Sequence, residues 1–264
     1  MPTRRIEDPT FASRFECKYR ISPLHAPQVR QFIEPFMRPD PFAERYEGFC
    51  YPICSLYLDT DDLALYQQTV AGRKNRFKLR IRSYSDDPTL PVFAEIKYKI
   101  NNIVSKRRAR LDRAQAHKLL TCAERDWLDA LPEEDRAEAL AFDHERTLLG
   151  AKPICKVKYL REAYQSRSGD PVRITLDTDL MHAVSLEPDV ALAGGRWVTT
   201  PVDATILEIK YTNVFPRWIL DLVRFLSLRQ GPLPKYILSV DHMLNHGREA
   251  TLSIAGLTLP PRRT

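Results

Sequence analysis

Charged and apolar residues alternate along the stretch from Phe77 to Lys99. Basic residues take every second position in its first half, and Glu95 and Lys97 continue the alternation in its second half. Because successive side chains of a β-strand point to opposite faces, each half predicts a strand with one charged face. The Asp-Asp-Pro sequence at 86–88 is a turn signal, so the two strands can pair as a hairpin.

The same alternation recurs along the chain and predicts about eight strands. Helical spacing of apolar residues predicts helices after Ser22-Pro23, over 61–70, in an insert at 112–149 and over 215–229, whereas 234–244 fits a short strand or a helix. Strands and helices do not alternate strictly, which favours an α+β fold with an antiparallel sheet or barrel, in one domain over 1–264. The other predicted strands are 13–21, 50–59, 103–111, 154–164, 172–180 and 205–212.

Composition indicates which class of binding partner to expect. The chain has 264 residues, 44% hydrophobic and 28% charged, with a net charge of +6 and a pI of about 9.1, which favours a polyanionic partner. Its five cysteines are odd in number and no signal peptide precedes them, so we expect a cytoplasmic protein without disulfides. No apolar run is long enough for a transmembrane segment.

The charged strand faces carry mostly one sign. Arg76, Lys78, Arg80 and Arg82 are all cations, although like charges opposite each other across strands repel. A solvated sheet surface remains one interpretation of such faces. The other is a barrel that gathers the cations around an anion, for which a chain of phosphates is the simplest occupant.

Three carboxylates lie among these cations, Glu16, Glu95 and Glu208. Carboxylate oxygens suit Mg²⁺ and Mn²⁺, which also bind substrate phosphates, so these residues are candidate metal ligands. A sheet that binds nucleic acid instead carries aromatic residues among its cations. Here Tyr19, Phe77 and Tyr98 have the opposite parity, so no nucleic acid is expected.

Several of these segments together resemble one family. The sequence resembles the catalytic domain of the vacuolar transporter chaperone (VTC) polyphosphate polymerases, within the CYTH-like triphosphate tunnel metalloenzymes. The resemblance implies an antiparallel tunnel, a divalent metal (Mn²⁺ or Mg²⁺), and transfer of the γ-phosphate of ATP to polyphosphate. The segments that carry it are RFECKY (14–19), YLDT (57–60), FKLRIRSY (77–84), FAEIKYK (93–99), SKRRARL (105–111), KYLREAY (158–164), VRITLDTDL (172–180), ILEIKYT (206–212) and PKYIL (234–238).

The resemblance also implies roles for individual residues. Glu208 matches the metal-binding glutamate, and Glu16 and Glu95 are further candidates for the metal. Residues expected to act on the reacting phosphates are Lys18, Arg80, Arg82, Lys97, Arg161 and Arg173. Further phosphate-binding residues are Lys106, Arg108, Lys158, Lys210 and Lys235. Because Lys158 and Arg161 have opposite parity, a bulge is needed if both point inward.

Three functions remain open at this point. The first is polyphosphate synthesis from ATP, and the second is hydrolysis of tripolyphosphate or a nucleoside triphosphate in the same site with water as the acceptor. The third is a module that only binds polyphosphate. The sequence leaves the oligomeric state and the natural substrate open.

Overall fold

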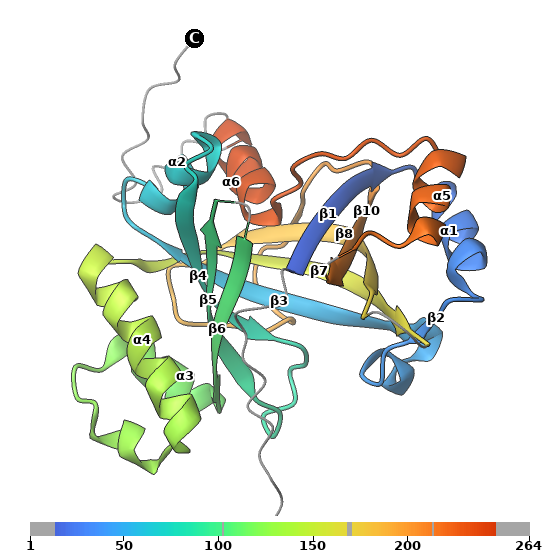
Figure 1. Cartoon of the computed structure of the whole chain (residues 1–264). Coiled ribbons are helices and arrows are strands. Elements are labelled where there is room, and N and C mark those ends of the chain that lie inside the picture. The colour runs from blue at the N-terminus through green and yellow to red at the C-terminus, as the bar shows by residue number, and fades with distance from the viewer. Residues whose placement is uncertain (1–13, 102, 168–170, 213, 247–264) are drawn as a thin grey trace, which may run out of the picture.

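The computed structural model describes residues 14–101, 103–167, 171–212 and 214–246. Its strands form one antiparallel sheet (Figure 1), whose main path has the order β1-β10-β8-β7-β3-β4-β5-β6. The short strands β2 and β9 pair with β7 and β8 beside this path. The predicted α+β fold with about eight antiparallel strands is confirmed. The strands are β1 Arg14–Ile21, β2 Met37–Pro39, β3 Cys50–Asp59, β4 Asn75–Ser83, β5 Val92–Ile100, β6 Ile103–Leu111, β7 Lys152–Ser166, β8 Arg173–Val184, β9 Val198–Thr199 and β10 Thr205–Thr212.

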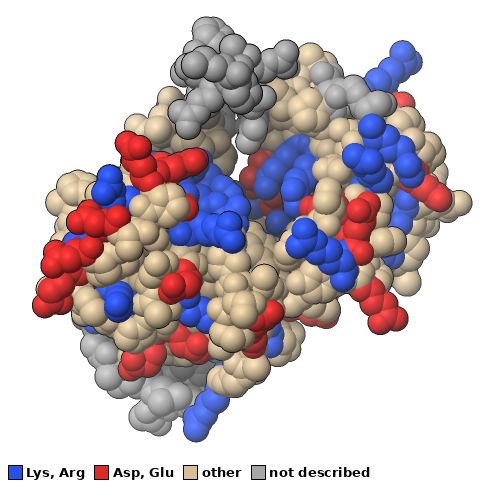
Figure 2. Space-filling view, turned by 90° about the horizontal axis from the view of Figure 1, so that it is seen from below, with Lys and Arg blue, Asp and Glu red and all other residues tan. Residues whose placement is uncertain are grey.

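The sheet is curled, so its edge strands β1 and β6 come close to each other. Among the described strands no backbone ladder joins these two edges. Instead, Lys97 on β5 reaches across to Glu16 on β1, with 3.2 Å between Nζ and Oε2. The curled sheet therefore has a concave inner face, whose hollow (Figure 2) is here named the channel, and this ion pair crosses the seam between β1 and β6.

Helices cover the outer face of the sheet, where apolar side chains gather. Leu79, Ile81 and Ile96 are at most 1% exposed and pack beneath the insert formed by α3, η3 and α4. Near the opposite edge of the sheet, α1 and α5 cover the same outer face and bury Val29 and Leu222 against β1, β8 and β10. The helices are α1 His25–Ile33, α2 Ala64–Val70, α3 Arg113–Thr121, α4 Glu133–Leu149, α5 Arg217–Phe225 and α6 Lys235–His246, with 3-10 helices η1 Ala43–Arg45, η2 Glu47–Phe49 and η3 Asp126–Ala130.

The helix ends agree with the sequence at the insert, whereas α2 begins at Ala64 rather than at 61 and α5 covers Arg217–Phe225 rather than 215–229. Helix α3 begins with a capping box between Asp112 and Gln115, and α4 ends at Gly150 in the left-handed region. Helix α1, in contrast, begins at His25 rather than at Pro23, because the Ser22 carbonyl accepts the His25 amide in a turn that precedes the helix. No helix of the described ranges is long and apolar enough to span a bilayer.

A buried carboxylate anchors two helices at one end of the channel. Asp59, the last residue of β3, is 0% exposed. Its Oδ1 accepts hydrogen bonds from the amides of Thr60 and Leu65, and its Oδ2 accepts them from the amide of Tyr66 and the hydroxyl of Tyr236, all at 2.7–2.9 Å. The three amides fix the start of α2, and the hydroxyl fixes α6, so Asp59 determines where α6 meets the sheet.

We predict that Asp59→Ala lowers the free energy of unfolding by about 3 kcal/mol, because it leaves several buried donors without an acceptor. Urea denaturation followed by circular dichroism measures this loss. The control is Asp61→Ala two residues away, which removes an exposed ion pair with Lys152 and is expected to cost less than about 1 kcal/mol. Equal losses in the two variants would show that Asp59 is not an anchor.

Candidate functional site: a channel lined by cations

Charged side chains on alternate strand positions line the channel. The pairing register sets Glu95 of β5 between Arg80 of β4 and Arg108 of β6, and sets Lys18 of β1 beside Glu208 of β10. Seen from below, lysine and arginine side chains gather on both sides of a hollow near the middle of the molecule (Figure 2). Strand alternation therefore converts the cationic stripes of the sequence into a lining.

The first ionic cluster surrounds Glu95, whose side chain is 0% exposed. Arg80 donates to Oε2 through Nε and Nη2 at 2.8 and 2.6 Å, and Lys106 donates to Oε1 at 3.2 Å. The Nε of Arg108 lies 3.6 Å from Oε1. Burial alone would raise the pKa of the Glu95 carboxyl, but Arg80, Arg82 and Lys106 together outweigh burial and lower that pKa far below its ordinary value.

The second cluster joins two carboxylates from neighbouring strands. Lys18 Nζ lies 3.0 Å from Glu16 and 3.4 Å from Glu208, and Lys210 Nζ lies 2.7 Å from Glu208. Lys97 reaches Glu16 from across the seam. Burial and the charge of Glu208 raise the pKa of Glu16, but Lys18, Lys97 and Lys210 prevail and lower it to about 2. Both carboxylates are therefore ionised at neutral pH.

The third cluster is centred on Asp177 of β8. Arg161 of β7 donates to both carboxylate oxygens, at 2.6 and 2.7 Å, and Lys235 at the start of α6 lies 2.5 Å from Oδ2. The side chain of Asp177 is only 1% exposed. Because Lys235 comes from α6, this cluster brings the C-terminal helix into the lining of the channel.

The remaining wall of the channel, on β3 and β7, carries hydroxyl groups. Arg82 donates to the Ser55 hydroxyl at 3.1 Å and to the Tyr159 hydroxyl at 3.4 Å, and Arg80 donates to the Tyr57 hydroxyl at 3.3 Å. These acceptors orient the arginines without neutralising them. The sequence pattern did not identify these three hydroxyl groups. Ser55 and Tyr57 lie on β3, which reads as a buried strand with no charged residue before Asp59, and Tyr159 lies on β7.

The structure separates two predicted residues from these clusters. Lys158 lies on the opposite face of β7 from Arg161, where its Nζ donates to the Leu192 carbonyl at 3.3 Å and lies 4.2 Å from the centre of a Trp197 ring. The β3–β7 register runs unbroken through Lys158 and Arg161, and the register shift between β7 and β8 at Lys158–Leu160 places the extra residue on β8, so β7 itself does not bulge to turn both side chains inward. Arg173 is 45% exposed and pairs with Asp40, which places it outside the three clusters.

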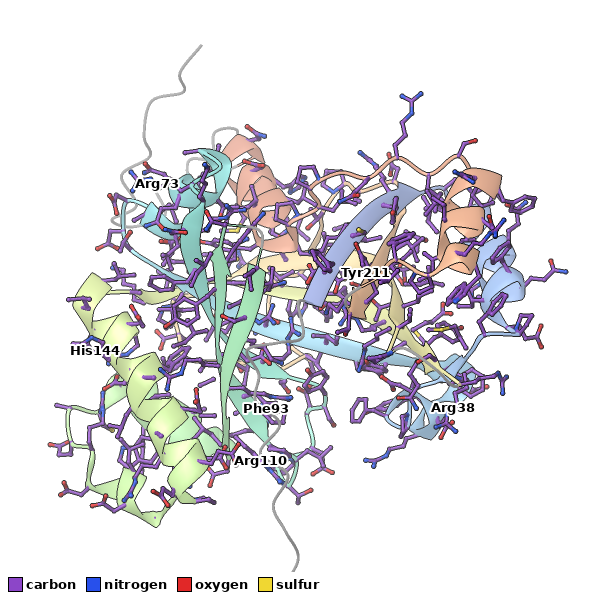
Figure 3. All side chains as sticks on the ribbon, in the orientation of Figure 1. Arg38, Arg73, Phe93, Arg110, His144 and Tyr211 are labelled. Atoms are coloured by element: carbon purple, nitrogen blue, oxygen red, sulfur yellow. The ribbon has the colours of Figure 1, made fainter. Side chains whose placement is uncertain are left out.

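An aromatic ring lies where β5 begins. Phe93 pairs with Arg82 across the hairpin, and the Arg108 guanidinium carbon lies 3.3 Å from the centre of its ring. Figure 3 shows Phe93 and Arg110 at the same end of the β5–β6 hairpin. Tyr19, Phe77 and Tyr98, in contrast, pack into the outer apolar clusters, as their parity in the sequence predicts.

Two of the three candidate metal ligands fit a divalent ion. No group of three or more His, Cys, Asp or Glu residues that could hold a metal occurs within the described ranges. Mg²⁺ and Mn²⁺, however, are often held by one or two carboxylates together with phosphate oxygens and water. Glu16 and Glu208 share Lys18 as a neighbour and can supply such a pair. Glu95 fits less well, because its fully buried carboxylate accepts two hydrogen bonds from the Arg80 guanidinium in addition to its contact with Lys106, whereas the ion pairs of Glu16 and Glu208 are with lysines.

Comparisons with known proteins identify the family of this chain. The family model described as "VTC domain" matches residues 13–244. The chain is 26% identical over 208 residues to vacuolar transporter chaperone complex subunit 4 of Schizosaccharomyces pombe, which covers 65% of this chain. It spans only 29% of the length of that relative.

Solved structures show weaker similarity. One is a candidate adenylate cyclase from Bacillus halodurans, with a TM-score of 0.43, 15% identity, and coverage of 84% of this chain and 95% of that chain. Another is a candidate adenylyl cyclase from Hippeastrum with a dominant triphosphatase activity, with a TM-score of 0.44, 14% identity, and coverage of 87% and 96%. These similarities carry no argument about the reaction. The family model, in contrast, matches most of the chain, and the chain belongs to the VTC domain family.

Proposed function

We propose that this chain transfers the γ-phosphate of ATP to a growing polyphosphate held in the channel. The observation that carries the proposal is the excess of cations over carboxylates on one enclosed surface. The lining includes Lys78 and Arg82, which have no carboxylate partner among the described residues, beside the three ionic clusters. Enclosed cations are costly unless anions compensate them, and a chain of phosphates supplies regularly spaced anions.

The clusters suggest how the chain of phosphates is held. A phosphate that enters the channel competes with Glu95 and Asp177 for Arg80 and Arg161, whose planar guanidinium groups already make two hydrogen bonds each to a carboxylate. Phosphoryl transfer requires little beyond such positioning and charge stabilisation, with the attacking and leaving oxygens in line. Residues of these clusters are therefore placed to hold the phosphoryl donor and the phosphoryl acceptor in line along the channel.

The metal belongs to the same proposal. Glu16 and Glu208 would hold Mn²⁺ or Mg²⁺, and the ion would supply positive charge that offsets the negative charge of the phosphates. The side chains of Lys18 and Lys210 flank these carboxylates and are placed to hold the phosphate next to the ion. Membership of the VTC domain family supports ATP and polyphosphate as the substrate and product.

The product formed from ATP and Mn²⁺ tests this function directly. We expect a ladder of long polyphosphate chains on a gel. Free phosphate alone would identify a triphosphatase, which uses the same site with water as the acceptor. Neither product, together with tight binding of tripolyphosphate, would identify a module that only binds polyphosphate.

We predict that Arg80→Ala weakens tripolyphosphate binding at least tenfold, since hydrogen bonds to charged groups contribute about 1.5–3 kcal/mol each. Isothermal titration calorimetry without metal measures the change. Arg107→Ala is the matched control, because Arg107 lies on β6, two strands from Arg80 in the same sheet, but pairs with Glu138 on the outer surface. Equal binding by the two variants would remove Arg80 from the phosphate site.

We further predict that Glu208→Gln lowers turnover more than a hundredfold, because the amide keeps the shape of the side chain and loses the charge that binds a divalent ion. Tripolyphosphate binding without metal should remain, since the same change leaves Lys210 without its carboxylate partner. Glu138→Gln, on the outer surface, is the control and should retain full turnover. Unchanged turnover in Glu208→Gln would contradict the assignment of the metal.

A further inference from the structure

Lys78 is the channel cation for which neither the sequence nor the family resemblance assigns a role. It lies on β4 between Arg76 and Arg80, on the face that lines the channel, and the strand register places it opposite Lys97 of β5. Its Nζ is 5.8 Å from the centre of the Tyr236 ring on α6. Figure 3 shows Arg73, shortly before β4, at the end of the sheet covered by α2, so Lys78 belongs to the part of β4 near this end.

The other lysines of the channel have acidic partners, and Lys78 does not. Lys18, Lys97 and Lys210 each lie within 4.0 Å of Glu16, whereas no carboxylate of the described residues forms an ion pair with Lys78. Asp59 follows Leu58, the last β3 residue paired with β4, and is thus near in the sheet. Both of its oxygens are already held by three amides and the Tyr236 hydroxyl.

Burial and the neighbouring cations disfavour the charge of Lys78, whereas the cation–π contact with the Tyr236 ring favours it only weakly at 5.8 Å. Burial is the largest effect, followed by the positive charges of Lys18 on β1, Lys97 on β5, and Arg76 and Arg80 on β4, and together they lower the pKa of Lys78 to about 7. The facing group from α6 is the neutral phenol of Tyr236. With a pKa near 7, the Lys78 amine is therefore only partly protonated at neutral pH when the channel holds no anion.

We propose that Lys78 binds the phosphate chain and takes up a proton from solvent as the chain enters the channel. The amine gains one proton and becomes an ammonium group that donates to phosphate oxygens, so that the ligand supplies the negative charge that the protein lacks at this position. The inference rests on the proposed function, because it needs a phosphate chain in the channel. It adds a residue to the site and links occupancy of the channel to proton concentration.

Linkage fixes the sign of the pH dependence. The charged form of Lys78 binds phosphate, so its contribution is fully present below about pH 7, where the amine is already protonated in the free protein. As pH rises above 7, binding must include uptake of a proton, and the affinity falls by up to about tenfold per pH unit until the bound amine itself loses its proton. Fixing the charge at this position should abolish that part of the pH dependence.

The experiment measures proton uptake when tripolyphosphate binds without metal. Calorimetric titrations at pH 8, in two buffers with different heats of ionisation, give the number of protons taken up. We expect the wild-type chain to take up about one proton more than Lys78→Arg, whose guanidinium is charged in both states. The control is Lys74→Arg, an exposed lysine just before the same strand, which should match the wild type.

A neutral variant provides the second measurement. Lys78→Gln is expected to bind tripolyphosphate at least tenfold more weakly than the wild type at pH 6.5, with the difference shrinking towards pH 8.5. Equal proton uptake by the wild type and Lys78→Arg, or equal affinity of the wild type and Lys78→Gln at pH 6.5, would overturn the role of Lys78 alone. A wild-type chain that binds no tripolyphosphate would overturn the proposed function as well.

Discussion

The structure depends on how positive charge is accommodated inside a curled sheet. Cations on β1, β4, β5, β6 and β10 face one another, and carboxylates placed between them make the arrangement stable. Arg80 and Lys106 compensate the buried charge of Glu95, and Glu95 in turn holds these two cations in place. Such clusters keep the cations in position for an anion. A phosphate can then take the place of a carboxylate beside a cation, and the cation needs little reorganisation.

Alternation in the sequence was sufficient to predict the cationic walls. Wherever a strand has one polar face, its period of two identifies the side chains that share the channel, and the structure brings Lys18, Arg80, Lys97 and Glu208 to that face. The same rule could not find Ser55, because β3 is buried along most of its length and shows no clear polar face. A strand of that kind contributes functional hydroxyls that its pattern does not reveal.

The two Glu-Ile-Lys segments show a second limit of sequence reasoning. Glu95 and Glu208 have the same neighbours along the chain and different neighbours across the sheet, namely Arg80 and Arg108 for the first and Lys18 and Thr175 for the second. Strand order thus surrounds Glu95 with two arginines and a lysine, and places Glu208 beside lysines and a second carboxylate, Glu16, with which it is a candidate metal ligand. The roles of such residues therefore follow from topology, which local patterns do not contain.

The seam between β1 and β6 has a mechanical consequence. In a barrel closed by a complete backbone ladder, the bore is set by strand number and stagger, and widening it breaks several hydrogen bonds at once. Here no backbone ladder joins the described edges, and the ion pair between Lys97 of β5 and Glu16 of β1 crosses the seam, so separating the edges would break no ladder hydrogen bond. A long polymer could then leave such a channel sideways, without having to be threaded out through either end.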